Sequence, residues 1–265
     1  MTNIIAMNNS KIPILLTSSV VAHDQEVKLK DTSDRIRLAI ESVVQWMKLD
    51  PKLQIILCDG SGFDFSSIVK RDFPEAQIEC LVFENDQEMV RQFGRGYGEG
   101  EIVRFALQNS FFIKKAGCFA KCSSKLWVHN YYDYIASWNG YLLCKGVFKN
   151  IFSLRGRAKL SYIDTRFYVT SRDAYEKYFL NVHFNIDVQK GYGLEDCFFD
   201  AFKSHGIMHA LSPVSPIING VGGGTGKYYK NSKLRISKEK FKLNWVRHKS
   251  VFEHLFACRQ YINQS

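Results

Sequence analysis

Two acidic residues, Glu195 and Asp196, follow a Gly-Tyr-Gly-Leu loop and begin a predicted helix that runs to Ser204. A carboxylate held beside a substrate hydroxyl can act as a general base that removes its proton. Acidic residues in a first helical turn also stabilise any helix through its dipole. The sequence therefore offers Glu195 or Asp196 as a catalytic base and leaves the choice between them open.

Two glycine-rich stretches predict loops that approach a ligand closely. The first, GRGYGEGE from Gly94 to Glu101, precedes a predicted helix whose N-terminus would favour an anion. The second, GGGTGKYY from Gly222 to Tyr229, lacks the spacing of a Walker A motif, and we interpret it as a flexible loop that closes on a ligand. The alternative for each is a connection that binds nothing.

A pair of opposite charges, Asp164 and Arg166, interrupts a predicted strand over residues 160–170. Charge inside an apolar strand costs free energy unless the groups are paired or exposed. The pair can therefore line a polar substrate site or form a salt bridge at the end of the strand.

Strands and helices alternate through the first half of the chain. Apolar runs predict buried strands at residues 12–21, 53–58, 78–83 and 111–117, separated by segments with helical spacing. This order is typical of an α/β fold with a mostly parallel sheet flanked by helices. Ligands bind such sheets beyond the carboxyl ends of the strands. The polar residues expected there are Ser18, Ser19, Asp59, Ser61, Lys114 and Lys115.

Charge is concentrated near the end of the chain. Residues 227–249 contain nine basic residues and one acid, within a chain of 265 residues whose formal net charge is +10. An apolar helical stripe follows, made of Val251, Phe252, Leu255, Phe256, Tyr261 and Ile262. Such a tail can rest on an anionic membrane surface, or the stripe can dock it on the rest of the protein.

The remaining features argue against several classes of protein. The first residues lack the pattern of a signal peptide, and no apolar run reaches the roughly 18 residues of a membrane span, so we expect a cytoplasmic location. The seven cysteines form no CxxC pair and the seven histidines form no cluster with metal-ligand spacing. These spacings argue against a zinc site.

Several motifs in order along the chain resemble the bacterial GT-A-like glycosyltransferases of surface polysaccharide synthesis, which build lipopolysaccharide O-antigen, core or capsule. The resemblance is carried by Leu16–Ser19, Arg35, Cys58–Gly62, Gly94–Glu101, Gly191–Asp196 and Gly222–Tyr229. It implies a Rossmann-type sheet, a nucleotide-sugar donor, and a glycan or lipid-linked acceptor. It also implies that Glu195 or Asp196 is the base and that Asp164 and Arg166 bind the acceptor. The implied donor-binding residues are Ser18, Ser19, Asp59, Ser61, Arg95, Gly96, Gly98, Glu99, Lys115, Thr225, Lys227 and Tyr228.

The Asp-x-Asp motif that holds a divalent cation in most such enzymes is absent from the sequence. A diphosphate leaving group still needs its charge neutralised. We therefore predict no bound metal, although Mg²⁺ or Mn²⁺ stays an alternative. Basic side chains would take its place, and the candidates are Arg95, Lys115, Lys121 and Lys227.

The resemblance divides the chain into a catalytic domain at residues 1–226 and a basic helical tail at residues 227–265. Within the domain, residues 1–125 would bind the donor and the less regular residues 126–226 the acceptor. An NAD(P)-dependent oxidoreductase is one alternative, but the first glycine-rich stretch lacks GxGxxG spacing and follows the third strand. A nucleic-acid-binding protein is another, but the basic residues cluster in the tail and not across an aromatic face.

Overall fold

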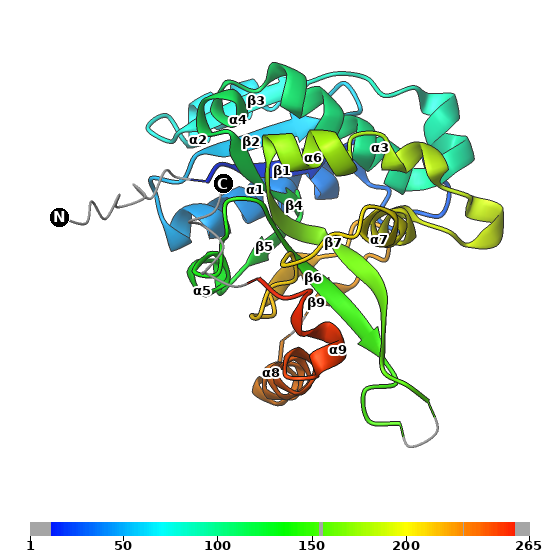
Figure 1. Cartoon of the computed structure of the whole chain (residues 1–265). Coiled ribbons are helices and arrows are strands. Elements are labelled where there is room, and N and C mark those ends of the chain that lie inside the picture. Colours follow the sequence, from blue (N-terminus) through cyan, green and yellow to red (C-terminus); the bar gives the residue numbers. More distant parts are fainter. Residues whose placement is uncertain (1–11, 154–155, 230, 258–265) are drawn as a thin grey trace.

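The structure, a computed structural model, describes residues 12–153, 156–229 and 231–257. Its main sheet has six strands (Figure 1): β1 (Ile14–Ser18), β2 (Ile55–Asp59), β3 (Ile78–Val82), β4 (Cys118–Ser123), β6 (Leu142–Lys149) and β7 (Lys159–Ser171). The strand order is β3-β2-β1-β4-β7-β6, and the first four strands are parallel to one another. Strands β7 and β6 are antiparallel to their neighbours. The predicted α/β fold with a mostly parallel sheet is confirmed.

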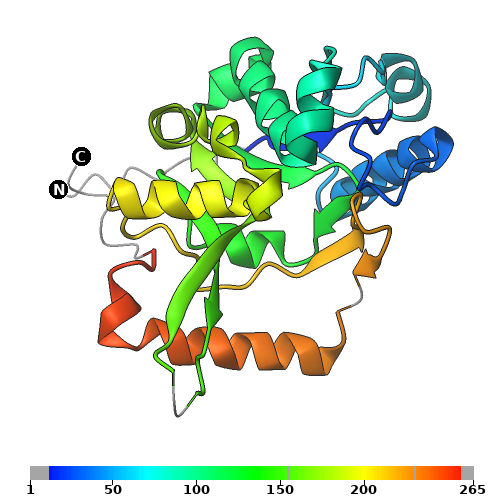
Figure 2. The same cartoon turned by 90° about the vertical axis from the view of Figure 1, so that its right-hand side faces the viewer.

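Helices cover both faces of this sheet (Figures 1 and 2). Side chains alternate between the faces along each strand, so Leu15 and Ile56 join one core cluster while Ile14 and Ile55 join the other. The helices are α1 (Thr32–Leu49), α2 (Ser66–Asp72), α3 (Gln87–Asn109), α4 (Phe111–Ala116), α5 (Tyr131–Ile135), α6 (Arg172–Tyr178), α7 (Leu194–Ser204), α8 (Lys233–Arg247) and α9 (Ser250–Glu253). Helices α3 and α7 contribute to the first cluster, and α1 contributes to the second.

A small antiparallel sheet brings the second half of the chain beside the first. It contains β5 (Leu126–Val128), β8 (Ile218–Val221) and β9 (Tyr228–Tyr229), in the order β5-β8-β9. Two short 3-10 helices, η1 (Val182–Asn185) and η2 (Val188–Lys190), precede α7. Residues 222–226 connect β8 to β9. Because β8 pairs with β5, the small sheet brings this glycine turn close to the segment that joins β4 to β5.

The first glycine-rich stretch is helical, and its prediction as a loop is wrong. Residues 94–101 lie within α3, which departs from helical geometry only at Gly94, where φ is 76°. The glycines allow close packing of that helix. A Cβ atom on Gly100 would lie 2.3 Å from Cγ of the buried His183, and one on Gly96 would lie 3.2 Å from Cβ of Leu194. The absence of these side chains lets η1 and α7 pack directly against α3.

The strand predicted at residues 111–117 is also wrong. The Ser110 side chain accepts a hydrogen bond from the backbone N–H of Ile113, which starts α4, and Gly117 ends the helix with a φ of 65°. The fourth parallel strand begins one residue later, at Cys118. Its carboxyl end is therefore near Ser123, and Lys114 and Lys115 lie on a surface helix instead.

The apolar stripe predicted after residue 250 faces the protein. Phe252 and Phe256 are each 7% exposed, and both rings contact Phe148 of β6. Only Val251, at 69%, points outward among the residues of the stripe named here. The stripe therefore docks the end of the chain on the core, and two of its predicted members lie outside the described residues: Tyr261 and Ile262. Among helices of the described segments, none combines the length and apolar character needed to cross a membrane.

Candidate active site

A cavity of about 660 Å³ opens at the carboxyl ends of β1 and β4. Strands β2 and β4 lie on opposite sides of β1, so the order of the strands reverses at this point, where α/β sheets bind their ligands. The strand ends contribute a largely polar wall to the cavity: Thr17, Ser18, Ser19, Gly60, Ser123, Ser124 and Lys125. The ends of β1, β2 and β4 and the residues that follow them thus form one wall of the cavity.

Arg35 is a buried cation in this wall, only 5% exposed. Its guanidinium donates hydrogen bonds to the backbone oxygens of Ser19 and Leu29, both at 2.7 Å. Burial lowers the pKa of Arg35, and the nearby negative charge of Asp59 partly offsets that effect. These bonds fix the guanidinium near the end of β1 and leave it without a carboxylate bound to it among the described residues.

Lys125 is a second buried cation beside Arg35, also 5% exposed. Burial, together with repulsion from Arg35, lowers the pKa of Lys125 to about 7 although Asp59 acts in the opposite direction. Its ammonium nitrogen lies 3.5 Å from the hydroxyl of Ser124. Two cations in one buried wall are costly, and Asp59 compensates them only in part. The arrangement is suited to an anionic ligand.

The second glycine-rich stretch crosses the cavity close to these cations. A Cβ atom on Gly223 would lie 3.9 Å from the ammonium nitrogen of Lys125, and one on Gly224 would lie 2.7 Å from the guanidinium carbon of Arg95. Arg95 belongs to α3, and its backbone N–H donates to the carboxylate of Asp24. The two glycine-rich stretches therefore meet at Arg95, with glycine giving the guanidinium the space it occupies.

Two oxygen atoms in the cavity wall have no hydrogen-bond partner within the part of the chain that the structure describes. They are Oγ of Ser18 and Oδ1 of Asn85, and both residues are less than 7% exposed. The amide nitrogen of Asn85 is used, since it donates to the backbone oxygen of Gly98. A buried polar atom without a partner costs about 1–3 kcal/mol. A polar ligand could supply the missing partners.

Glu195 reaches the same cavity from the start of α7. Its carboxylate accepts a hydrogen bond from the hydroxyl of Thr165 at 3.2 Å. Burial raises the pKa of Glu195, and the negative charges of Glu99 and Asp164 add to the effect. Glu99 is held in place by Lys121, whose buried ammonium lies 2.5 Å from it. A carboxylate with a raised pKa facing a cavity has the properties of a general base.

Asp196 has a different role although it is the next residue. Its carboxylate accepts the backbone N–H of Gly193 at 2.9 Å, which caps the first turn of α7. Asp196 does not line the cavity. The geometry thus separates the two acids that the sequence left together, with Glu195 facing the cavity and Asp196 stabilising the helix.

Most of the predicted donor-binding residues do come together. The members that line the cavity are Ser18, Ser19, Arg95, Gly96, Gly98, Glu99 and Thr225. Asp59 and Ser61 do not line it. The Asp59 carboxylate accepts hydrogen bonds from the backbone N–H and the hydroxyl of Ser61 in its own turn, and from the backbone N–H of Val20 in the loop after β1. Asp59 is therefore occupied in holding the loop after β2, as an Asx turn does.

Three predicted cations or rings also lie away from the cavity. Lys115 is exposed on α4, where its ammonium lies over the ring of Phe111. Lys227 and Tyr228 are exposed beyond the glycine turn and are absent from the cavity wall. Their places in the wall are taken by Lys125 and Arg35. Lys125 is not predicted as a site residue, because β4, the strand before it, is not recognised from the sequence. The buried Lys121 interrupts the apolar pattern of that strand.

The end of β4 is where a metal-binding pair of aspartates would be expected, and its residues do not fit a divalent cation. The segment reads Ser123-Ser124-Lys125, two hydroxyls and an ammonium. Hard cations prefer carboxylate and carbonyl oxygens, and an ammonium repels them. Over the described residues, no group of three or more His, Cys, Asp or Glu side chains has a metal-binding arrangement. No chemical step is therefore assigned to a metal here.

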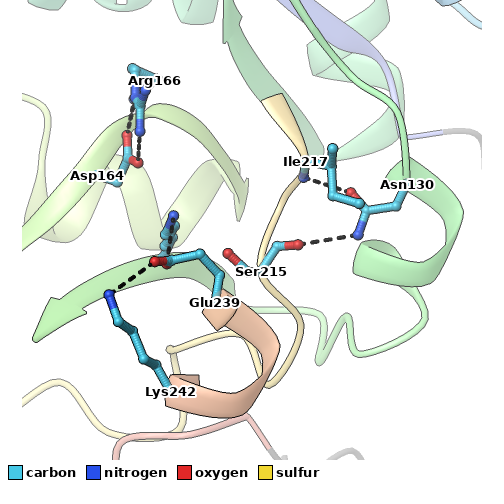
Figure 3. Close-up of polar contacts among 8 residues, drawn as sticks. Asn130, Asp164, Arg166, Ser215, Ile217, Glu239 and Lys242 are labelled. Carbon is cyan, nitrogen blue, oxygen red and sulfur yellow. Dashed lines mark hydrogen bonds and ion pairs between the residues drawn. The ribbon is translucent and has the colours of Figure 1, made fainter. Parts of the chain in front are cut away.

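A second cavity, of about 280 Å³, adjoins the first and lies between the β6–β7 hairpin and α8. Arg166 and Tyr229 line both cavities, and the Arg166 guanidinium lies over the Tyr229 ring at 5.1 Å. Asp164 is 3% exposed and pairs with Arg166 through two hydrogen bonds (Figure 3). Burial alone would raise the pKa of Asp164, but the bonds from Arg166 outweigh it and the pKa is lowered.

The opposite wall of the second cavity is also built from paired groups. Glu239 of α8 lies 3.3 Å from Lys242 and 3.9 Å from Lys145 of β6 (Figure 3). Asn130 fixes the adjacent loop, since its amide donates to the backbone oxygen of Ser215 and accepts from the backbone N–H of Ile217. The second cavity therefore combines paired charged groups with apolar side chains such as Phe148, Ile236 and Val246.

Comparisons with known proteins find distant structural likeness only. No protein-family model and no curated protein sequence matches the chain. A structure of the bifunctional glycosyltransferase WbbM matches at 11% identity and a TM-score of 0.41, covering 74% of this chain and 37% of that one. A structure of HddC from Yersinia pseudotuberculosis matches at 15% identity and a TM-score of 0.36, covering 63% of this chain and 80% of that one. A structure of a 4-diphosphocytidyl-2C-methyl-D-erythritol synthase matches at 11% identity and a TM-score of 0.41, covering 88% of this chain and 98% of that one.

Proposed function

We propose that this chain is a glycosyltransferase that moves a sugar from a nucleotide-sugar donor to a glycan or lipid-linked acceptor. The observation that carries the proposal is the pair of buried cations, Lys125 and Arg35, at the point where the sheet reverses its strand order. Diphosphate is the anionic group of a nucleotide-sugar, and it would compensate both charges. The resemblance drawn from the sequence extends the proposal to acceptors of bacterial surface polysaccharide synthesis and to a cytoplasmic reaction.

Donor binding is assigned to the first cavity. Lys125 and Arg35 would hold the diphosphate, and Arg95 would close over it with the glycine turn. The Asn85 amide oxygen would accept a hydrogen bond from a hydroxyl of the nucleoside or sugar, and the Ser18 hydroxyl would donate or accept one. Preorganised cations stabilise the charge that develops on a leaving diphosphate. In this arrangement basic side chains perform the task that a metal performs elsewhere.

Sugar transfer then needs one proton acceptor, and Glu195 is placed to provide it. The bond from the anomeric carbon to the diphosphate oxygen breaks, and its electron pair leaves with the nucleoside diphosphate. The acceptor oxygen bonds to the anomeric carbon, and its proton passes to the Glu195 carboxylate. A base with a raised pKa takes the proton more readily. We assign the acceptor to the second cavity, beside Asp164 and Arg166, because the two cavities share lining residues.

A thermal-shift screen of the full chain with UDP-sugars, CMP-sugars, CTP, NADH and oligonucleotides tests the donor class. A ligand that binds only the folded chain raises its Tm, and we expect a rise with one class of nucleotide-sugar. A rise with NADH or an oligonucleotide alone would contradict the proposal. Synthesis of a nucleotide-sugar from CTP and a sugar phosphate would replace it with nucleotidyl transfer.

Variants at the two adjacent acids test the base. Glu195→Gln should lower kcat by about 10²–10⁴-fold and leave the donor Kd unchanged, because only proton transfer is lost. Asp196→Ala should keep turnover and lower the free energy of unfolding by about 1 kcal/mol, the usual cost of a lost helix cap. Because the pKa of Glu195 is raised, kcat should fall with decreasing pH before reaching the ordinary 4.5. Wild-type turnover by Glu195→Gln would remove the assignment.

A further inference from the structure

Helix α8 presents two contrasting faces. Its inner face lines the second cavity with Ile236, Glu239, Leu243 and Val246, and Val246 is fully buried. Its outer face carries Leu234, Phe241 and Trp245, which are 83%, 60% and 50% exposed. These three residues recur at intervals of seven and four, which places them on one side of a helix.

The turn that follows β6 extends the outer face. It brings Phe152, 53% exposed, beside α8, and Figure 2 shows the β6–β7 hairpin crossing that helix. The ring centroid of Phe152 lies 6.0 Å from that of Phe241 and 6.1 Å from that of Trp245. We call Phe152, Leu234, Phe241 and Trp245 the aromatic patch. Large apolar side chains gathered and exposed in this way mark an interaction surface.

Basic residues surround the aromatic patch. Lys233 and Lys238 are exposed on α8, and the ammonium of Lys249 lies over the Trp245 ring at 6.0 Å. The single acid in residues 227–249 is Glu239, which is turned to the inner face and paired there. The outer face is therefore apolar at its centre and positive around it.

We propose that the aromatic patch and its lysines dock the protein on an anionic membrane surface. Trp, Phe and Leu side chains on one face of a helix insert at the boundary between lipid headgroups and acyl chains, and the indole N–H of Trp can stay hydrated there. Each lysine near an anionic bilayer adds about 1 kcal/mol of attraction. A second copy of this chain fits less well, because two such faces would bring the same positive charges together. The proposal does not depend on the transferase assignment.

Docking would also place the second cavity near the lipid. The cavity lies on the inner side of α8, so only the width of one helix, about 10 Å, separates it from the docked face. If the second cavity takes the acceptor, this placement favours an acceptor that is itself attached to lipid. The inference of a lipid-attached acceptor rests on the proposed function, whereas membrane docking can be measured without any activity.

Co-sedimentation of the full chain with vesicles of phosphatidylcholine, with and without phosphatidylglycerol, tests the docking. We expect binding to the anionic vesicles that weakens as salt is added. The variant Phe241→Gln/Trp245→Gln should lose at least tenfold in partitioning. The variant Lys233→Gln/Lys238→Gln should lose about 25-fold, or about fivefold for each lysine. None of these four residues lines either cavity.

The matched control is Phe111→Gln, which removes an equally exposed ring (62%) from α4. It should bind vesicles as the wild type does, and every variant should keep the wild-type Tm and its response to donor. Equal sedimentation with neutral and anionic vesicles, or wild-type binding by the Phe241→Gln/Trp245→Gln variant, would overturn the proposal. A wild-type dimer that this variant converts to a monomer would overturn it in favour of self-association.

Discussion

Lys125 gives the sharpest test of the site, because its charge costs stability when the cavity is empty and contributes to binding when it is filled. Its pKa falls from 10.5 to about 7. At about 1.4 kcal/mol for each pH unit, keeping Lys125 protonated in the empty cavity costs on the order of 5 kcal/mol. A diphosphate beside the ammonium would recover part of that free energy. Donor binding should therefore be accompanied by proton uptake.

The donor Kd should depend on pH in a defined direction. Binding raises the pKa of Lys125 above its value in the free protein, so the affinity is fully present below about pH 7 and declines as pH rises. The Kd should weaken by up to about tenfold for each pH unit above 7 until the pKa of the complex is reached. Isothermal titration calorimetry with the nucleotide-sugar found by thermal shift measures this between pH 6 and about 8.5, where the diphosphate keeps its charge.

Lys125→Met separates the two effects of the charge. Without the ammonium, the donor Kd should rise and lose its pH dependence. The empty protein should become more stable, because the folded-state pKa lies below the unfolded one. That gain is complete below about pH 7 and disappears as pH approaches the unfolded value of about 10.4. A donor Kd without pH dependence in the wild type, or unchanged in Lys125→Met, would refute the role of Lys125.

Three further predictions follow from the packing and from the end of β4. Gly224→Ala would place a Cβ atom 2.7 Å from the Arg95 guanidinium carbon, so we expect the Arg95 side chain to move. The donor Kd, measured by calorimetry, should rise about tenfold, which corresponds to the loss of roughly one charge-assisted hydrogen bond. An unchanged Kd would contradict the placement of Arg95 at the donor. Gly100→Ala would place a Cβ atom 2.3 Å from the His183 ring, and urea denaturation should show a loss of about 1–3 kcal/mol, whereas full stability would contradict the packing assigned to α3. Adding EDTA should leave sugar transfer unchanged, and activity lost and then restored by Mn²⁺ would contradict the metal-free reading.

The sequence predicts the sheet well where apolar runs are continuous and fails where packing decides. Strands β1 and β2 are uninterrupted buried runs, so hydrophobic pattern alone locates them. The pattern places the fourth strand at residues 111–117, because Phe111 and Phe112 look like strand residues. The true strand, β4, contains Lys121, whose buried ammonium is paired with Glu99 of α3 and donates to the backbone oxygen of Thr165. A partner 22 residues away cannot be read from local sequence.

The candidate site shows the same division. Ser18, Ser19 and Glu195 are found from position alone, because each follows a strand or begins a helix. Lys125 is missed because the strand before it is misplaced, although a lysine two residues after a parallel strand would have been a sufficient signal once β4 was located. Asp59 is over-assigned, because spacing cannot show that its carboxylate is already occupied by its own turn.

The wall shared by the two cavities has a thermodynamic consequence. Arg166 and Tyr229 belong to both linings, and Tyr229 follows the glycine turn that packs against Arg95. A ligand that orders this turn in one cavity also fixes part of the surface that the other cavity offers. We therefore expect occupancy of the two cavities to be coupled, with the same coupling free energy whichever ligand binds first. Donor and acceptor would then change each other's Kd by the same factor, through a single arginine–tyrosine contact.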